Sequence, residues 1–168
     1  MVMRLRDLAE GTGVKVNFSQ DVAVPPGYGL AVETVAVSFS GVVTRLGDGA
    51  AVTGHLAAVL QMTCGRCLCD VTQNVSVTAD ERFKQVGDNS GDGDSFIVQH
   101  ETLDLSPMLS TNLMLNIPLK VLCGTQCKGL CPTCGTDLNT VPCACDTASK
   151  NPHFGVLSDI FPTTNHRR

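Results

Sequence analysis

Apolar and polar residues alternate along most of residues 31–83, and a period of two is typical of β-strands with one buried face. Three such runs follow one another. The glycine-containing segment 46–50 separates the first two, and its Asp-Gly pair favours a hairpin turn. We therefore expect antiparallel strands that share an apolar face. The predicted members of that face are Val35, Val37 and Phe39 in the first run, Val52, Leu56, Leu60 and Met62 in the second, and Val71, Val75 and Val77 in the third.

The segments on either side of these strands follow other patterns. Residues 1–30 contain many glycines and prolines, which predicts an irregular lead-in with short strand-like pieces. Residues 104–116 predict a helix, because Asp104 can cap the first turn and Pro107 suits that turn. A shorter helix is expected in the tail, near 151–160.

These elements predict an α+β protein in two parts. Residues 1–119 form a mainly antiparallel β-rich domain that ends in the helix at 104–116 and carries an acidic loop at 87–94. Residues 120–168 form a cysteine-rich, zinc-ribbon-like module with a C-terminal helix or tail. Glycines and prolines separate the six cysteines of this module, so it has too few apolar residues to build a core alone.

Composition excludes several classes of protein. Hydrophobic residues make up 43% of the 168, which is enough apolar surface for a core and rules out a wholly disordered chain. No apolar run reaches the ~18 residues that a membrane-spanning helix needs. The acidic residues among the first ten disagree with a secretion signal. We expect a cytoplasmic protein without a membrane partner.

Net charge and aromatic content argue against a general nucleic-acid binder, since the charge is −4 and the chain has no Trp and one Tyr. The charge is uneven, however. Residues 87–119 hold five acidic and no basic groups, whereas residues 120–168 hold five basic and three acidic groups. The cysteine-rich end is therefore the predicted partner surface. The basic residues near the cysteines, which are candidate RNA contacts, are Arg66, Lys120, Lys128, Lys150, Arg167 and Arg168.

Nine cysteines are the main chemical feature of the chain. In a reducing compartment, clustered cysteines indicate metal ligation or thiol chemistry rather than disulfides. Pairs separated by two to four residues are half-sites for tetrahedral zinc, and the spacing predicts two structural Zn²⁺ sites. One comprises Cys131, Cys134, Cys143 and Cys145. The other comprises Cys64, Cys67, Cys123 and Cys127, and would join the cysteine-rich end to the sheet. A different partition, such as Cys127 paired with Cys131, stays open.

Other chemistry for these cysteines stays open. Four thiolates also ligate iron–sulfur clusters, although Pro-x-Cys-Gly turns favour closed zinc sites. Cys64 and Cys67 could form the redox dithiol of a thiol oxidoreductase, but such a motif usually opens a helix and here lies between strands. Cys69 is the ninth cysteine and is expected to be a small, half-buried hydrophobic residue. No phosphate loop or nucleophile elbow is present, so we expect neither a catalytic residue nor a small-molecule substrate.

Taken in order, these motifs resemble the YceD family of large ribosomal RNA subunit accumulation proteins. The likeness covers roughly residues 30–160. It is carried by Cys64-Gly-Arg-Cys-Leu68, Glu81-Arg-Phe83, Leu103-Asp-Leu105, Leu115-Asn-Ile-Pro-Leu-Lys120, the run from Leu122 to Asn139, Cys143-Ala-Cys145 and Asn151-Pro-His-Phe154. Two features depart from the family: the helix after Asp104 lacks the usual Glu and Arg, and Cys69 stands where a Glu is common.

The resemblance implies a bacterial, cytoplasmic, non-enzymatic factor that supports processing and accumulation of large-subunit ribosomal RNA and ribosome assembly. The implied partner is that RNA, or a ribosomal or assembly protein. An interaction adaptor without direct RNA contact is one alternative. The thiol oxidoreductase is an alternative from another class.

Overall fold

The computed structural model describes residues 1–28, 30–85 and 95–145. The chain divides into two compact units. The first comprises Met1–Gly65 and Cys69–Cys123, and the second comprises Arg66–Leu68 and the chain from Gly124 onward. No helix in the described part is long and apolar enough to cross a membrane.

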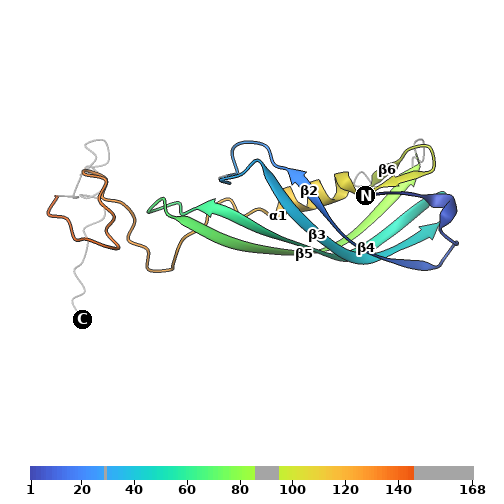
Figure 1. The fold of residues 1–168 in the computed structure, drawn as a ribbon, viewed down its shortest axis with the longest axis horizontal. Coiled ribbons are helices and arrows are strands. Elements are labelled where there is room, and N and C mark those ends of the chain that lie inside the picture. Colours follow the sequence, from blue (N-terminus) through green and yellow to red (C-terminus); the bar gives the residue numbers. More distant parts are fainter. Residues whose placement is uncertain (29, 86–94, 146–168) are drawn as a thin grey trace, which may run out of the picture. The chain divides into compact units, whose positions relative to one another are not determined.

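The first unit is built on a sheet in which each strand pairs with its neighbours in sequence. The strands in order are β2 (Gly13–Ala23), β3 (Thr34–Leu46), β4 (Gly49–Thr63), β5 (Asp70–Gln85) and β6 (Phe96–Val98). The pairings from β2 to β5 are antiparallel, as the alternating pattern predicts. The short β6 joins β5 in parallel, which the pattern does not indicate. Figure 1 shows the long strands β3, β4 and β5 side by side.

The prediction of an irregular lead-in with short strand-like pieces is wrong for one long segment of residues 1–30, the strand Gly13–Ala23. The whole of β2 pairs with β3, from Gly13 opposite Thr44 to Ala23 opposite Thr34. The sequence signal is weak because β2 is an edge strand that buries only Val16 and Val22 of its 11 residues. An edge strand gains its backbone hydrogen bonds from one neighbour and needs few apolar side chains to stay in place.

A second, two-stranded sheet leads into the helix. It pairs β1 (Val2–Arg4) with β7 (Thr102–Asp104), and a short 3₁₀ turn, η1 (Leu5–Asp7), follows β1. The helix α1 spans Ser106–Asn116, two residues later than the predicted start at 104. Asp104 ends β7 instead, and its carboxylate accepts a hydrogen bond from the Ser106 backbone N–H at 3.0 Å. Asp104 therefore still satisfies one of the free N–H groups at the start of the helix.

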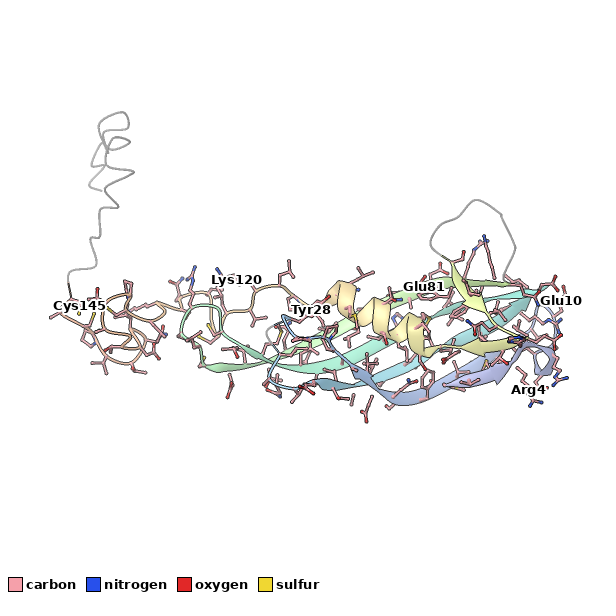
Figure 2. The ribbon with its side chains drawn as sticks, turned by 90° about the horizontal axis from the view of Figure 1, so that it is seen from above. Arg4, Glu10, Tyr28, Glu81, Lys120 and Cys145 are labelled. Carbon is pink, nitrogen blue, oxygen red and sulfur yellow. The ribbon has the colours of Figure 1, made fainter. Side chains whose placement is uncertain are left out.

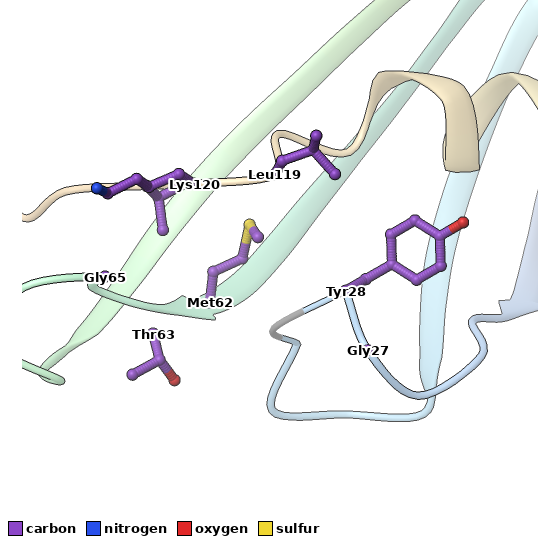
Figure 3. A pocket seen from close by; sticks show the side chains of 8 residues that line it. Gly27, Tyr28, Met62, Thr63, Gly65, Leu119 and Lys120 are labelled. Carbon is purple, nitrogen blue, oxygen red and sulfur yellow. The ribbon is translucent and has the colours of Figure 1, made fainter.

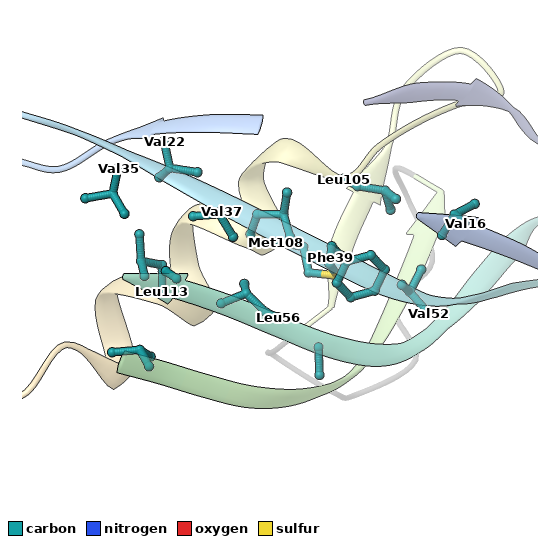
Figure 4. Packing of buried hydrophobic residues seen from close by; sticks show 14 of the residues in the cluster. Val16, Val22, Val35, Val37, Phe39, Val52, Leu56, Leu105, Met108 and Leu113 are labelled. Carbon is teal, nitrogen blue, oxygen red and sulfur yellow. The ribbon is translucent and has the colours of Figure 1, made fainter. Parts of the chain in front are cut away.

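The core of the first unit lies between the sheet and α1 (Figure 4). Met108, Leu109 and Leu113 of the helix are fully buried. The predicted apolar face of the strands is confirmed, since eight of its members belong to the buried cluster while Val71 and Val77 pack against it partly buried. The eight are Val35, Val37, Phe39, Val52, Leu56, Leu60, Met62 and Val75.

One polar side chain is buried among these residues. Asn112 of α1 is 8% exposed, and its Nδ2 donates to Glu81 Oε1 at 2.8 Å and to the Met108 carbonyl at 3.1 Å. Glu81 lies on β5 (Figure 2). Both amide hydrogens thus have acceptors, which removes most of the cost of burying the amide.

Two glycines make room for the ring of Phe39 in the core. Gly41 and Gly54 are cross-strand partners on β3 and β4. A Cβ built on either residue would lie 2.7 Å from the Cζ of Phe39, so the Phe39 ring occupies the space that two side chains would need. Glycine generally weakens a strand. Its presence at these two positions is explained by the close approach of the aromatic ring.

The second unit is organised by turns rather than strands. Leu130 and Asp137 form an isolated antiparallel bridge, and the Leu138 N–H donates to the Gly129 carbonyl at 3.0 Å. Among the described residues of this unit, the buried side chains are those of Cys67, Cys127 and Cys131. The apolar cluster of the first unit includes none of its residues. The predicted acidic loop at 87–94 and the tail helix lie outside the described residues.

Candidate metal centres

Two chain segments supply the first set of cysteines, here named the hairpin group: Cys64, Cys67, Cys123 and Cys127. Cys64 and Cys67 lie in the turn between β4 and β5, and the other two follow α1. All four sulfur atoms lie within 4.8 Å of one another. Cys64, Cys67 and Cys127 are buried, whereas Cys123 is exposed.

Backbone hydrogen bonds hold the turn of the hairpin group. The Cys64 N–H donates to the Cys69 carbonyl at 2.8 Å, and the Gly65 N–H donates to the Val121 carbonyl at 2.9 Å. The Cys123 N–H points at the Cys64 sulfur at 3.4 Å, a contact that reduces negative charge on a thiolate. Cys69 contributes its carbonyl to this turn. Its side chain is exposed, so the expectation of a half-buried hydrophobic residue is wrong.

Arg66 ties the tip of the turn to the segment around Cys127. Its Nη1 donates to the Cys127 carbonyl at 2.8 Å, and its own carbonyl accepts from the Leu130 N–H at 3.1 Å. Gly129 has a φ of +78°, and a Cβ there would lie 3.1 Å from the Arg66 carbonyl oxygen. Glycine is therefore required at 129 both for its backbone angle and for this close approach.

The second set, here named the knuckle group, comprises Cys131, Cys134, Cys143 and Cys145. Its sulfur atoms also lie within 4.8 Å of one another. The Cys131 N–H donates to the Thr136 carbonyl at 2.8 Å, and the Gly135 N–H donates to the Cys131 carbonyl at 2.9 Å. Gly135 has a φ of +74°, which closes the tight turn after Cys134. Only Cys131 is buried; Cys134 is exposed, and Cys143 and Cys145 are intermediate.

The knuckle turn separates its thiols into two electrostatic classes. Backbone N–H groups of Cys134 and Thr133 donate to the Cys131 sulfur and lower the pKa of that thiol to about 6. The hydroxyl and backbone of Thr136 lower the pKa of Cys134. A hydrogen bond to the Cys134 sulfur, partial desolvation and repulsion from that sulfur raise the pKa of Cys145 to about 12. Two of the four thiols therefore ionise more readily than a free thiol, and their charge disfavours ionisation of the other two.

Both groups fit a tetrahedral metal ion. Four sulfurs at about 2.3 Å from a central Zn²⁺ lie ~3.8 Å apart, and separations within 4.8 Å need only a small contraction to reach that value. A divalent cation would also relieve the repulsion among the thiolates. The nine cysteines are free of disulfides. Two groups of four that could hold metal ions are thus present, with the membership that the spacing predicts.

Comparison with known proteins decides the family. A family model described as "YceD: Large ribosomal RNA subunit accumulation protein YceD" matches residues 52–161, well over half of the chain and every cysteine of both groups. The chain belongs to the YceD family. No solved structure gives a significant match to it.

Relatives within the YceD family carry two kinds of name. A protein of Mycobacterium tuberculosis named as uncharacterized is 32% identical over 104 residues, which cover 60% of this chain and 50% of the relative. The Arabidopsis thaliana protein named "Large ribosomal RNA subunit accumulation protein YCED homolog 1, chloroplastic" is 31% identical over 58 residues, or 34% of this chain and 18% of the relative. The matches to the mycobacterial relatives thus span about half of their length.

The predicted RNA contacts divide into described and undescribed residues. Arg66, Lys120 and Lys128 have exposed side chains. Arg66 also has the structural role given above, which the sequence did not reveal. Lys150, Arg167 and Arg168 lie outside the described residues. A role in RNA binding stays a prediction for all six.

Lys120 borders a pocket of about 160 Å³ in the first unit. Figure 3 shows the side chains that line it, with Met62 between Tyr28 and Lys120. The aliphatic part of the Lys120 side chain packs over Gly65. A Cβ built on Gly65 would lie 3.3 Å from two carbon atoms of Lys120. Leu119 is 95% exposed beside the pocket. Sequence patterns gave no sign of this pocket, since its lining comes from segments far apart in the chain, around Tyr28, Met62 and Leu119.

Proposed function

We propose that the chain is a non-enzymatic cytoplasmic factor that supports processing and accumulation of large-subunit ribosomal RNA during ribosome assembly, and that each cysteine group holds a structural Zn²⁺. The observation that carries this proposal is the family match over 52–161, which contains all eight cysteines of the two groups. The plant relatives that share the description support the link to large-subunit RNA.

In this proposal zinc holds the cysteine-containing turns rigid, and basic side chains near them contact the RNA. A closed Cys₄ site has no open coordination position for substrate, which suits a structural role. Each filled group carries a charge of about −2, from four thiolates and one Zn²⁺. RNA contact therefore depends on the exposed cations Arg66, Lys120 and Lys128. Because the chain carries a net charge of −4, a protein partner such as a ribosomal or assembly protein supplies part of the binding.

The burial of the hairpin group weighs against the thiol oxidoreductase alternative. A redox dithiol needs an accessible nucleophilic sulfur. Cys64 is 0% exposed and Cys67 is 8% exposed. Two further sulfurs lie within 4.8 Å of both, which is the arrangement of a ligand set.

A ribosome profile in depleted cells tests the functional proposal. Sucrose-gradient fractions should show a deficit of mature large subunits with accumulated RNA precursors, and the protein should co-sediment with those precursors in a salt-sensitive manner. An unchanged profile would refute the role in accumulation. Crosslinking then separates direct contact from an adaptor role, since an adaptor yields no RNA adducts at Arg66, Lys120 or Lys128.

Elemental analysis of the purified protein tests the metal proposal separately. We expect about two Zn²⁺ per chain and no iron–sulfur absorption. Cys64→Ser should lose about one Zn²⁺, whereas the matched variant Cys69→Ser, outside both groups, should retain both. Equal metal content in the two variants would contradict the assignment of the hairpin group.

A further inference from the structure

Asn139 lies between the two halves of the knuckle group in sequence, yet its side chain contacts a sulfur of the hairpin group. Its Nδ2 lies 3.6 Å from the Cys127 Sγ and is hydrogen bonded to it. Cys127 is buried, so its sulfur has little access to solvent hydrogen bonds. An N–H group directed at a thiolate reduces its charge and fixes the orientation of the ligand.

The amide of Asn139 is fully used in this position. Nδ2 also donates to Asp137 Oδ1 at 2.7 Å, and Oδ1 accepts the Lys128 backbone N–H at 2.8 Å. A primary amide has two N–H donors and one carbonyl acceptor. Each of these three groups has a partner here, and the partner of the carbonyl, Lys128, follows Cys127 directly in the chain. The same side chain thus holds the backbone N–H of Lys128, the residue after Cys127, through its oxygen and the Cys127 sulfur through its nitrogen.

The position of Asn139 depends on the knuckle turn. Its backbone N–H donates to Asp137 Oδ1 at 2.9 Å. Asp137 in turn bridges to Leu130, immediately before Cys131. Cys134 and Cys143 flank this stretch of chain on either side of Asn139. A metal ion in the knuckle group would clamp both ends of the loop that presents the amide.

We propose that Asn139 is a positioning residue for the hairpin group and couples metal binding at the two groups. This inference rests on the proposed metal binding and adds a mechanism to it. With the knuckle group filled, the loop is fixed and the Asn139 amide is held against Cys127. With the knuckle group empty, that contact is lost more easily and the hairpin group binds metal more weakly. Coupling of this kind is reciprocal, so metal in the hairpin group also strengthens binding in the knuckle group.

Cobalt(II) titration of the full chain against a competing chelator tests the proposal. Asn139→Ala should weaken metal binding at the hairpin group by about 10- to 100-fold, the range for loss of an outer hydrogen bond to a ligand. Thr140→Val is the matched control. It removes a hydrogen bond from the same loop to the Asp137 carbonyl, without contact to a sulfur, and should leave hairpin-group affinity within about twofold.

The sulfur-to-cobalt absorption supplies a readout that loss of folding would not mimic. Removing an N–H donor raises the energy of the thiolate electrons, so the charge-transfer band of the hairpin group should move to lower energy in Asn139→Ala. Asn139→Asp keeps the size and the acceptor but places a negative charge near the sulfur, and should move the band further. An unchanged band in both variants would overturn the proposal.

A double-mutant cycle tests the coupling itself. Cys143→Ser with Cys145→Ser disables the knuckle group and should weaken the hairpin group. Adding Asn139→Ala should then cost little more, because both changes act through one contact. Fully additive effects would refute the coupling. Absence of metal from every variant and the parent chain would instead refute the metal part of the proposed function, while a normal metal content with no Asn139 effect would refute this inference alone.

Discussion

The two units of this chain reach a fixed structure by different physical routes. The first buries an apolar cluster between a long antiparallel sheet and one helix, and its largest buried side chains are aromatic and aliphatic. The second buries only cysteine side chains among its described residues. Burial of apolar area stabilises the first in proportion to the area removed from water. The second has no comparable area and needs cross-links of another kind.

Because the two units are stabilised differently, different perturbations should unfold them. Substitutions in the apolar cluster should destabilise the first unit and leave the hairpin group and the knuckle group able to bind metal. Removal of metal should affect the second unit and leave the sheet intact. Perturbing one unit at a time should therefore show whether the two units are stabilised independently or together.

Metal removal should have the largest effect. Incubation with a strong chelator under reducing conditions should abolish amide protection at Leu130, Cys131 and Leu138, because structural zinc supplies about 10–16 kcal/mol in small zinc peptides. Amides of β3 to β5 should keep their protection. Hydrogen exchange followed by NMR measures both. Simultaneous loss of protection in the sheet would show that the apolar cluster does not sustain the first unit by itself.

Phe39→Ala should cause the next largest effect, in the first unit. Phe39 is 2% exposed, and removing a buried ring costs about 3–5 kcal/mol. Denaturant unfolding monitored through the strands measures the loss. Ser40→Ala, on the opposite face of β3, is the control and should change stability by less than about 0.5 kcal/mol. Zinc content should stay the same in both variants, and its loss in Phe39→Ala alone would link the two routes.

Gly54→Ala should destabilise the sheet by a smaller amount, about 1–3 kcal/mol. The new Cβ would lie 2.6 Å from the Ser40 carbonyl oxygen and 2.7 Å from the Gly41 Cα, and backbone atoms cannot easily move away. Gly124→Ala is the matched control, since nothing lies within 4 Å of a Cβ built there. Thermal unfolding compares the two. Equal melting temperatures would mean that β3 and β4 can separate without cost.

The smallest expected effect is the release of protons when the knuckle group binds metal. The pKa of Cys143 is raised and that of Cys145 is raised to about 12, so both are thiols at neutral pH and must each lose a proton to ligate. Filling the knuckle group should therefore release about two or more protons, and its affinity should fall as pH falls. Calorimetry in buffers of different ionisation enthalpy counts them. Release of fewer than one proton would contradict the raised pKa values.

Much of the sheet was predictable because a half-buried strand repeats its apolar residues with period two. The runs around Val37, Leu56 and Val75 follow that rule, and all three residues are buried. The sequence predicts the edge strand β2 only as short strand-like pieces, because its apolar series is interrupted by Gln20 and most of its side chains are exposed. The parallel β5–β6 pairing was missed, since a three-residue strand carries no periodic signal.

The composition of the cysteine groups was predictable from spacing, because a tetrahedral site needs pairs of thiols a few residues apart. The hydrogen bonds around them were not predictable. Arg66 looked like a surface cation, and its contact with the Cys127 carbonyl depends on residues 61 positions apart. Asn139 carried no signal at all, since an asparagine in a loop most often hydrogen bonds its own neighbours.

Which residues can be buried and which could ligate a metal follows from the amino-acid sequence, because side-chain polarity and thiol chemistry are local properties. The sequence also determines the order of motifs that places the chain in the YceD family. The folded chain alone reveals which sulfurs approach within 4.8 Å, which amide contacts the Cys127 sulfur and which glycines leave room for the Phe39 ring. Such contacts join residues far apart in the chain, and their geometry follows from the pairing of strands and the closure of turns rather than from any short stretch of sequence.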